Sequence, residues 1–428
     1  MKSAGLLTRG FVFALTASAA SREFYPDIAR ILQKHCQVCH RPGEIAPMPL
    51  LTWEQARPWA KAIGEAVALR RMPPWFADPH YGHFASDPSL SPEDIAAIEG
   101  WVAAGAPEGS PQRAPNPVEW PSGWTTVEPD IILTMPRPFP IPAKAVIDYQ
   151  YLILPTHFSI DRWVRAVEIR PSDRSVVHHA VLYVRDPGSA WLRDVPAGVM
   201  WAPPNDDVRA VRATRDTKAD ILAVYTPGAS AMVCPPGMAK KVPAGSDLVL
   251  QLHYTSKETP RQDQTRIGIT LYNGEPQRRI LTLQMGSDNF VIPPGDRDYR
   301  VRVTGTLPRD ALLLDMLPHM HLRGSEFEYQ LVPSDGPMHT LLRVKPYDFY
   351  WQLCYQLATP LQLHGGDRLI FTAHFDNSAN NPRNPDPAAE VRWGEQSWQE
   401  MMIGFFDVAV EPDVDKPAFF AARWKKSE

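Results

Sequence analysis

Residues 176–184 have the sequence V-V-H-H-A-V-L-Y-V, a short apolar run rich in valine that is typical of a buried β-strand. Two adjacent histidines, His178 and His179, interrupt this run. Neighbouring strand residues point to opposite faces of a sheet, so both imidazoles can serve one site only at a bulge or a strand end. Imidazoles buried among apolar side chains also need partners for their nitrogens. The run therefore predicts a β-sheet that carries a polar site.

Runs of similar character follow on both sides of this stretch. Strands are expected at 146–154, 163–169, 176–184, 248–254, 267–272, from 299 onward, 312–316, 327–331, 368–375 and 402–408. Proline and glycine turns separate these short strands, a pattern typical of β-sandwiches and jelly rolls. Two sandwiches are expected at 126–288 and 289–412, with I-P-P-G at 292–295 near their boundary and a tail at 413–428.

Three further histidines lie in the expected strands or just after one. His253 occurs in Q-L-H-Y-T, on a different strand from His178 and His179. His319 and His321 form H-M-H, and a period of two residues places both imidazoles on one face of a strand. A single histidine of this kind is more often a core residue than a metal ligand, because imidazole has many roles. The combination of His-His with His-X-His favours metal binding.

A second motif lies near the N-terminus. Residues 36–40 form C-Q-V-C-H, which in an exported chain is the pattern for covalent attachment of c-type haem through Cys36 and Cys39, with His40 on the iron. A redox disulfide and half a zinc site are the alternatives, although no second ligand pair follows nearby. Met72, in R-R-M-P-P-W, is expected as the distal iron ligand, as in the small bacterial c-type cytochromes that this segment resembles. Met48 is its rival, and His80 and His83 are weaker candidates.

The surroundings of C-Q-V-C-H predict helices. An amphipathic helix is expected from Thr52 to Arg70, and Ser91-Pro92-Glu93-Asp94 has the features of a helix start. Gly105 is expected to end this second helix. These patterns predict a small all-α cytochrome c domain at 22–108, followed by a proline-rich linker at 109–125. The expected fold is therefore an all-α domain followed by two all-β jelly-roll sandwiches.

The first residues predict export. Basic residues precede a short apolar stretch, and Ala17-Ser18-Ala19 offers a cleavage site, so residues 1–19 are expected to be a signal peptide. No segment is apolar over the length that a membrane-spanning helix needs. The net charge of −4 gives no bulk attraction to nucleic acid. The mature chain is therefore expected to be periplasmic or secreted, with no nucleic-acid partner and no transmembrane segment.

Five short motifs in this order resemble a known family: P-D-I-I-L-T-M at 129–135, V-V-H-H-A at 176–180, Q-L-H-Y at 251–254, P-H-M-H-L-R-G at 318–324 and S-W-Q-E-M-M at 397–402. Roughly residues 126–412 look like the ascorbate-dependent type II copper monooxygenases, which include dopamine β-hydroxylase and peptidylglycine α-hydroxylating monooxygenase. The resemblance implies an electron-storing copper bound by three residues, His178, His179 and His253. It implies an oxygen-activating copper bound by His319, His321 and Met401, with Met402 as a rival for Met401.

The implied activity is hydroxylation of a C–H bond of a small organic molecule with O2, using two copper ions. Electrons would come from ascorbate, from a periplasmic redox protein or through the haem. The carboxylate clamp of the peptidylglycine enzymes is replaced by Leu317, and Ile403 and Phe405 stand where the family has polar and aromatic partners. An apolar or aromatic substrate is therefore expected. The cysteines Cys234 and Cys354 can bridge the sandwiches or stay reduced.

Two other functional classes remain at this stage. The first is a periplasmic copper and haem protein that transfers electrons or binds copper without oxygenase activity. The second is a zinc hydrolase, because three histidines and a water molecule also form a catalytic zinc site. No general-base glutamate lies beside His178 or His253 in the sequence, and a methionine ligand favours copper(I) over zinc.

Overall fold

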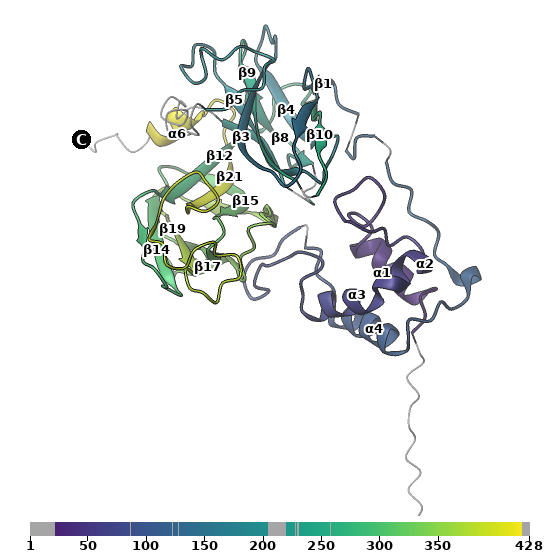
Figure 1. Ribbon diagram of the computed structural model, residues 1–428. Helices are drawn as coiled ribbons and strands as arrows, with labels where there is room; N and C mark the ends of the chain where they lie inside the picture. The colour runs from purple at the N-terminus through teal and green to yellow at the C-terminus, as the bar shows by residue number, and fades with distance from the viewer. Residues whose placement is uncertain are drawn as a thin grey trace, which may run out of the picture.

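The protein is described from a computed structural model that covers residues 22–421, except 86, 122, 127, 204–219, 227, 229, 230 and 257. The expected signal peptide at 1–19 lies outside these residues. The α-helices are α1 (Asp27–His35), α2 (Trp53–Ala56), α3 (Ala60–Ala68), α4 (Pro92–Ala103) and α6 (Lys416–Ala421). Two 3-10 helices are η1 (Arg57–Trp59) and η2 (Pro111–Arg113). Most of the regular structure is β-sheet, and the two β-sandwiches are seen in Figure 1.

The first sandwich is built from two antiparallel layers. Its strands are β1 (Ile131–Thr134), β2 (Phe139–Ile141), β3 (Val146–Pro155), β4 (Arg162–Arg170), β5 (Val177–Arg185), β6 (Asp220–Tyr225), β7 (Met232–Val233), β8 (Met238–Val242), β9 (Asp247–Thr255), β10 (Arg261–Asp263) and β11 (Arg266–Leu271). One layer has the order β3-β9-β5-β6, and the other contains β1-β11-β4-β8. Alternate residues of β5 and β9, such as Leu182 and Leu250, fill the core between the layers.

The second sandwich follows the same principle. Its strands are β12 (Arg278–Ser287), β13 (Val291–Ile292), β14 (Tyr299–Thr306), β15 (Ala311–His319), β16 (Gly324–Val332), β17 (His339–Val344), β18 (Tyr355–Leu363), β19 (Arg368–Phe375), β20 (Val391–Arg392) and β21 (Met402–Val410). The layer β14-β19-β16-β17 packs against β12-β21-β15-β18. A short parallel pairing of β8 with β12 joins this second layer to β1-β11-β4-β8, so one long sheet runs through both sandwiches. The expected pair of sandwiches is confirmed.

The two sandwiches face each other through one layer each. Tyr151 and Tyr183 point out of the first sandwich from β3 and β5, away from its core, and pack with Phe405 of β21. Because strand residues alternate between faces, Phe406 turns instead into the core of the second sandwich. The outward faces of β3-β9-β5-β6 and β12-β21-β15-β18 therefore form the two walls of the space between the sandwiches.

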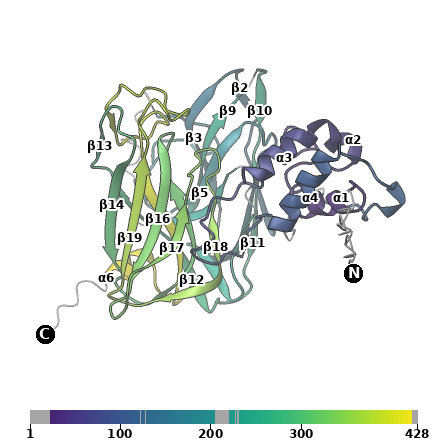
Figure 2. The same cartoon turned by 90° about the horizontal axis from the view of Figure 1, so that it is seen from below.

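The N-terminal segment differs from the expected all-α domain. Its helices are short, the longest having 12 residues, and long irregular stretches at 36–51 and 69–90 separate them. Figure 2 shows these helices to one side of the sandwiches. The prediction of an all-α cytochrome c domain was therefore wrong, since the chain is mostly β-sheet and this segment is only partly helical. Helix α4 does begin as expected, because Ser91 Oγ accepts a hydrogen bond from the Asp94 backbone N–H.

Two features of the sequence explain why helices are few here. The helix expected from Thr52 to Arg70 is interrupted by a 3-10 turn that contains Pro58, because proline lacks the N–H that continues an α-helix. The stretch 75–85 lies instead along the second sandwich. Ala77 forms an isolated bridge with Val344, and Phe84 forms one with Leu357. We call residues 75–85 the strap.

Aromatic side chains hold the strap in place. The rings of Trp75 and Phe84 lie 4.8 Å and 5.7 Å from the ring of Tyr355 on β18. Backbone hydrogen bonds add to these contacts, for example from Ala85 N–H to the Gln356 carbonyl at 2.9 Å. The strap therefore covers β18, which is the last strand of the long sheet.

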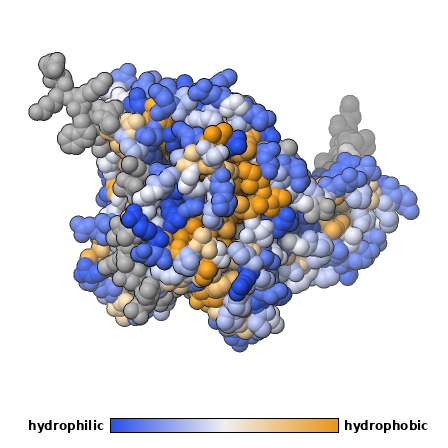
Figure 3. Space-filling model, turned by 90° about the horizontal axis from the view of Figure 1, so that it is seen from above, coloured by the Kyte–Doolittle hydropathy of each residue, from blue (hydrophilic) through white to orange (hydrophobic). Residues whose placement is uncertain are grey.

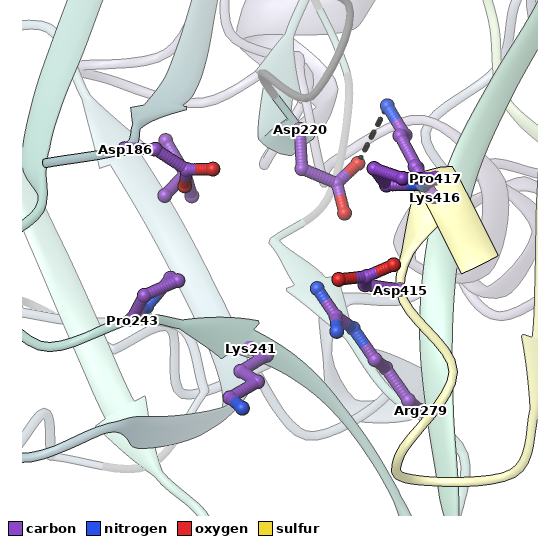
Figure 4. A pocket seen from close by; sticks show the side chains of 9 residues that line it. Asp186, Asp220, Lys241, Pro243, Arg279, Asp415, Lys416 and Pro417 are labelled. Carbon is purple, nitrogen blue, oxygen red and sulfur yellow. Dashed lines mark ion pairs between the residues drawn. The ribbon is translucent and has the colours of Figure 1, made fainter. Parts of the chain in front are cut away.

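Helix α6 closes the other side of the junction between the sandwiches. Lys416 pairs with Asp220 at 3.0 Å, beside a small cavity of about 100 Å³ into which the Arg279 side chain points (Figure 4). Three basic side chains and three aspartates line this cavity: Lys241, Arg279, Lys416, Asp186, Asp220 and Asp415. No histidine is among the residues that line it. The charged groups therefore balance one another at this junction.

Three general properties of the molecule concern membrane spans, cysteines and apolar surface. Among the residues that the structure describes, no helix has the length and apolar character needed to cross a membrane. All four cysteines are free thiols, including Cys234 and Cys354. Apolar surface gathers in the middle of the face seen in Figure 3, and polar surface surrounds it.

Candidate metal centres

The first group of histidines comes together at the end of two paired strands. His179 on β5 lies directly opposite His253 on β9, and the register shifts between Val177 and His179. This irregularity is the bulge that two adjacent ligands require, because it turns consecutive side chains toward one side. The ligand atoms of His178, His179 and His253 all lie within 4.8 Å of one another. The three residues are therefore arranged as one candidate metal site.

The geometry of this triad suits a metal ion. The Nδ1 atoms of His178 and His179 are 3.1 Å apart, a separation expected for two nitrogens that each lie about 2.0 Å from one ion. The His178 Nε2 atom is buried and has no hydrogen-bond partner among the described residues. All three side chains are buried, with exposed fractions of at most 8%. These imidazoles fit copper, which accepts nitrogen ligands of this kind.

Burial keeps these imidazoles neutral, which is the form that binds metal. Burial and, to a smaller extent, the nearby His319 lower the pKa of His178 to about 4. Burial also lowers the pKa of His253 to about 3, with a smaller contribution from His178. The pKa of His179 is held well below its usual value, mainly by burial. The triad therefore presents nitrogen lone pairs at neutral pH.

This neutrality predicts a pH dependence of stability in the copper-free protein. The unfolded histidines take up protons below pH about 6.5, whereas the folded His178 and His253 do not, so the free energy of unfolding falls as the pH drops from 6.5 to 4. At pH 5 each of these two histidines lowers the free energy of unfolding by about 2 kcal/mol. Urea unfolding at pH 7.5 and pH 5 measures this difference. His253→Asn should make the difference in unfolding free energy between the two pH values about 2 kcal/mol smaller.

The exposed His339 offers a matched control, because its ring contacts only the Pro337 carbonyl. His339→Asn should leave the pH dependence unchanged. If His253→Asn behaves like His339→Asn, the burial argument for the triad is wrong.

The second group lies on the facing wall. His319 ends β15, His321 follows two residues later, and their ring centroids are 5.3 Å apart. Met401 precedes β21 and lines the same cavity as His319. Its rival Met402 is fully buried in the core of the second sandwich. Of the two methionines, Met401 is therefore the one that faces the cavity. Two imidazoles and a thioether suit copper(I).

Gln352 orients His319 in a way that the sequence did not indicate. The Gln352 side-chain oxygen lies 2.6 Å from His319 Nδ1, so that nitrogen donates a hydrogen bond and Nε2 carries the lone pair. The Gln352 backbone carbonyl accepts a hydrogen bond from Thr226 of the first sandwich at 3.0 Å. Partners of this kind fix the ring and the tautomer of a ligating histidine. No local pattern indicates this contact, which joins residues distant in the chain.

Glu400 holds the turn that carries His321. This buried carboxyl group accepts hydrogen bonds from the backbone N–H groups of His321 at 3.0 Å and Arg323 at 2.6 Å. Burial raises the pKa of Glu400 to about 8, and these backbone donors oppose the rise. Because Glu400 immediately precedes Met401, it ties the histidine turn to the methionine. It is a second functional residue that sequence reasoning missed.

One aromatic ring lies between the two groups. Phe349 stacks on His178 with centroids 4.8 Å apart, and its edge approaches His321 at 6.1 Å. A single side chain therefore contacts an imidazole from each group. The two candidate sites face each other at close range across the space between the sandwiches.

A cavity of about 580 Å³ connects these groups with the N-terminal motif. Its lining includes His179, His319 and Met401 at one part and Cys36, Cys39, His40 and Met72 at another. His40 Nδ1 donates a hydrogen bond to the Met48 carbonyl at 3.1 Å, so the lone pair of this imidazole lies on Nε2. The structure thus brings the C-Q-V-C-H motif and Met72 to one cavity.

The rival iron ligands are placed differently. Met48 packs against the core of the N-terminal segment. His80 is exposed and bonds Asp78 at 2.7 Å, and His83 is exposed on the strap. Of these candidates, only Met72 shares the cavity lining with Cys36, Cys39 and His40.

Residues 278–403 match the profile of a family described as "Copper type II ascorbate-dependent monooxygenase, C-terminal domain". The matched region contains His319, His321 and Met401. The match supports a function of the copper monooxygenase type. No curated protein matches the chain.

Several viral proteins show a distant structural likeness. The infectious bursal disease virus VP2 subviral particle has 8% identity and a TM-score of 0.20, over 70% of this chain and 77% of that one. PBCV-1 VP54, fitted into a reconstruction of the virophage Sputnik, has 6% identity and a TM-score of 0.25. The match covers 66% of this chain and 95% of that one. The major capsid protein P2 of bacteriophage PM2 has 10% identity and a TM-score of 0.22. The match covers 57% of this chain and 100% of that one. Likeness at this level supports no statement about function.

Proposed function

We propose that the protein is a copper-dependent monooxygenase that hydroxylates a C–H bond of a small organic molecule with O2. The observation that carries this proposal is the pair of ligand groups on facing walls, which reach one cavity through His179 on one side and through His319 and Met401 on the other. One group has three imidazoles and the other has two imidazoles and the Met401 thioether. The balanced reaction takes one substrate molecule, O2, two electrons and two protons to the alcohol and water.

The residues have distinct roles in this proposal. His178, His179 and His253 would hold one copper ion, and His319, His321 and Met401 would hold the other. Bound copper supplies one-electron chemistry with dioxygen. Gln352 fixes the orientation of His319, and the Phe349 ring lies between His178 and His321. The chain thus supplies oriented ligands beside a cavity with mostly apolar walls.

Apolar side chains favour an apolar or aromatic substrate. Leu317 and Phe405 lie opposite each other on β15 and β21, and Ile403 lies opposite His319. All three line the cavity next to the second ligand group. A cavity with mostly apolar walls and a few polar groups is typical of a small-molecule site.

The electron source belongs to the same proposal. Ascorbate is the reductant that the family description implies. A haem bound covalently through Cys36 and Cys39, with His40 and Met72 on the iron, would be a second source, because these residues line the cavity that reaches His319. Covalent haem and free copper ligands both suit a periplasmic or secreted protein.

Metal and haem content tests the proposal. The full chain, produced in an exporting host that attaches c-type haem and then loaded with copper, should contain two copper ions and one haem. With O2 and ascorbate it should consume oxygen and form an alcohol from an apolar substrate. A protein that binds two coppers but forms no product would be an electron-transfer or copper-binding protein. A zinc-loaded protein without copper would overturn both assignments.

A further inference from the structure

Four consecutive residues, 349–352, reach three separate parts of the protein. They lie in the loop between β17 and β18. Phe349 contacts the first histidine group, and Gln352 contacts the second. Trp351 lies between them in the chain and lines the cavity that also holds the C-Q-V-C-H motif. This short loop is therefore the segment that connects the N-terminal motif with both candidate metal sites.

Trp351 approaches the motif at Gly228 of the first sandwich. Gly228 has a φ of +77°, and a Cβ atom at this position would lie 3.2 Å from Cζ3 of the Trp351 ring and 3.8 Å from the Cys39 sulfur. The ring and the sulfur therefore border the same point. Because glycine has no side chain, no side chain at position 228 separates them. The indole ring is thus a direct neighbour of the thiol to which haem is expected to attach.

The next residue carries the contact to the second group. The Gln352 side chain is buried, and its oxygen accepts the hydrogen bond from His319 Nδ1 at 2.6 Å. Its amide nitrogen donates to the Phe349 carbonyl at 3.2 Å, and its backbone carbonyl accepts from Thr226 at 3.0 Å. These partners hold the side chain in one orientation. Two residues joined by a peptide bond and one short hydrogen bond therefore connect the Trp351 ring with the His319 imidazole.

The loop reaches the first group only through ring contacts. The Phe349 and His178 ring centroids are 4.8 Å apart, and those of Tyr350 and His178 are 6.1 Å apart. Electron tunnelling weakens more steeply across space than along covalent and hydrogen bonds. The contacts of the loop therefore favour electron transfer from the motif to the second group.

The residues of the motif fit a covalently bound haem better than a single ion. Among the described residues, the triad of the first sandwich is the only group of three histidine, cysteine or carboxylate side chains close enough to share an ion. The ligand atoms of Cys36, Cys39 and His40 are therefore too far apart for that role. These residues line a cavity of about 580 Å³, a size typical of pockets for organic ligands.

We propose that Trp351 is an electron-relay residue, and that electrons from haem at the C-Q-V-C-H motif reach the second copper first, through Trp351, Gln352 and His319. The inference rests on the proposed function and deepens it by naming the route of the electrons. In each transfer one electron leaves the ferrous iron, which becomes ferric, and one copper(II) ion becomes copper(I). No bond forms or breaks in this step. Ascorbate or a redox protein returns the iron to the ferrous state.

The test follows electron transfer in the full chain, loaded with haem and copper(II), without O2 or substrate. His178→Ala should keep only the second copper, and His319→Ala only the first. Photoreduced flavin mononucleotide reduces the haem, haem absorbance then reports its reoxidation, and the copper(II) signal in electron paramagnetic resonance reports the acceptor. Reoxidation in His178→Ala should match the unaltered chain and be at least about tenfold faster than in His319→Ala. Equal rates in the two variants, or a faster rate in His319→Ala, overturn the proposal.

Substitutions of Trp351 locate the relay. Trp351→Leu should slow haem reoxidation at least about tenfold, because it removes the ring beside Cys39. Trp351→Phe keeps an aromatic ring and should recover part of the rate. Haem content, copper content and the midpoint potential of the haem should stay unchanged in both variants, which distinguishes a relay from a structural support.

Trp163→Leu is the matched control. Trp163 is half-buried like Trp351, but it lies on β4 against Lys241 and does not line the cavity. This variant should transfer electrons at the normal rate. If Trp351→Leu also keeps the normal rate, Trp351 is not the relay. If Trp351→Leu does not fold, the comparison of His178→Ala with His319→Ala still decides the route.

Failure of the relay and failure of the proposed function give different results. A chain that takes up haem but no copper overturns the proposed function and the relay with it, and the copper content shows this before any rate is measured. A chain with two coppers that forms product, but whose haem reduces the first copper faster, overturns the relay alone. A chain that attaches no haem also overturns the relay, and it leaves copper chemistry driven by ascorbate standing.

Discussion

Replacing His319 by alanine should remove one of the two coppers and lower product formation by roughly a thousandfold or more, because the metal ion that handles oxygen would lose a ligand. The other copper should stay, since His178, His179 and His253 belong to the first sandwich and keep their mutual geometry. Copper per chain and the rate of alcohol formation measure the two effects. Gln352→Leu should give a smaller loss of affinity, about 10- to 100-fold, because it removes only the partner of His319 Nδ1.

His339→Ala is the matched control for this prediction. His339 begins β17, is exposed, and contacts neither ligand group. This variant should retain both coppers and normal turnover. Retention of two coppers by His319→Ala, or equal losses in the two variants, would show that the H-M-H motif does not bind metal.

Removing the Glu400 side chain should have the largest effect on stability. Glu400→Ala leaves the buried N–H groups of His321 and Arg323 without their acceptor, which costs about 2–5 kcal/mol in the free energy of unfolding. Glu400→Gln keeps one acceptor oxygen and should lose less than half as much. Both variants should also bind the second copper more weakly, because the turn that carries His321 is loosened.

Denaturant unfolding and copper titration of the same samples measure both consequences. Glu390→Ala is the control, because the Glu390 carboxylate is exposed and pairs only with the exposed Arg392. Its effect should stay below about 0.5 kcal/mol. If Glu400→Ala is no worse than Glu390→Ala, the hydrogen bonds to the turn are not structural supports.

The β-strands were predictable because their signal is local. Runs such as 146–154 and 368–375 carry their own apolar pattern and have proline or glycine near one end, Pro155 after the first and Gly365-Gly366 before the second, and the structure contains β3 and β19 there. The adjacent pair His178 and His179 also predicted a local irregularity, which occurs as the bulge in β5. In these places the sequence pattern and the tertiary structure agree.

The remaining features depend on contacts between distant residues. Gln352 has no periodicity that links it to His319, and Phe349 meets His178 only after both sandwiches have formed. The error at the N-terminus has the same origin. Helical patterns at 52–70 and 91–105 suggested an independent all-α domain, but the prolines and glycines between them favour an extended strap that packs on β18.

The strap also imposes an order on the assembly of the protein. Ala77 and Phe84 pair with Val344 and Leu357, residues made near the end of synthesis. Contacts of such high contact order form late, because a long loop must close first. The thiols of Cys36 and Cys39 line a cavity whose other walls come from these late segments. In the proposed haem protein, attachment to Cys36 and Cys39 would therefore precede docking of the strap.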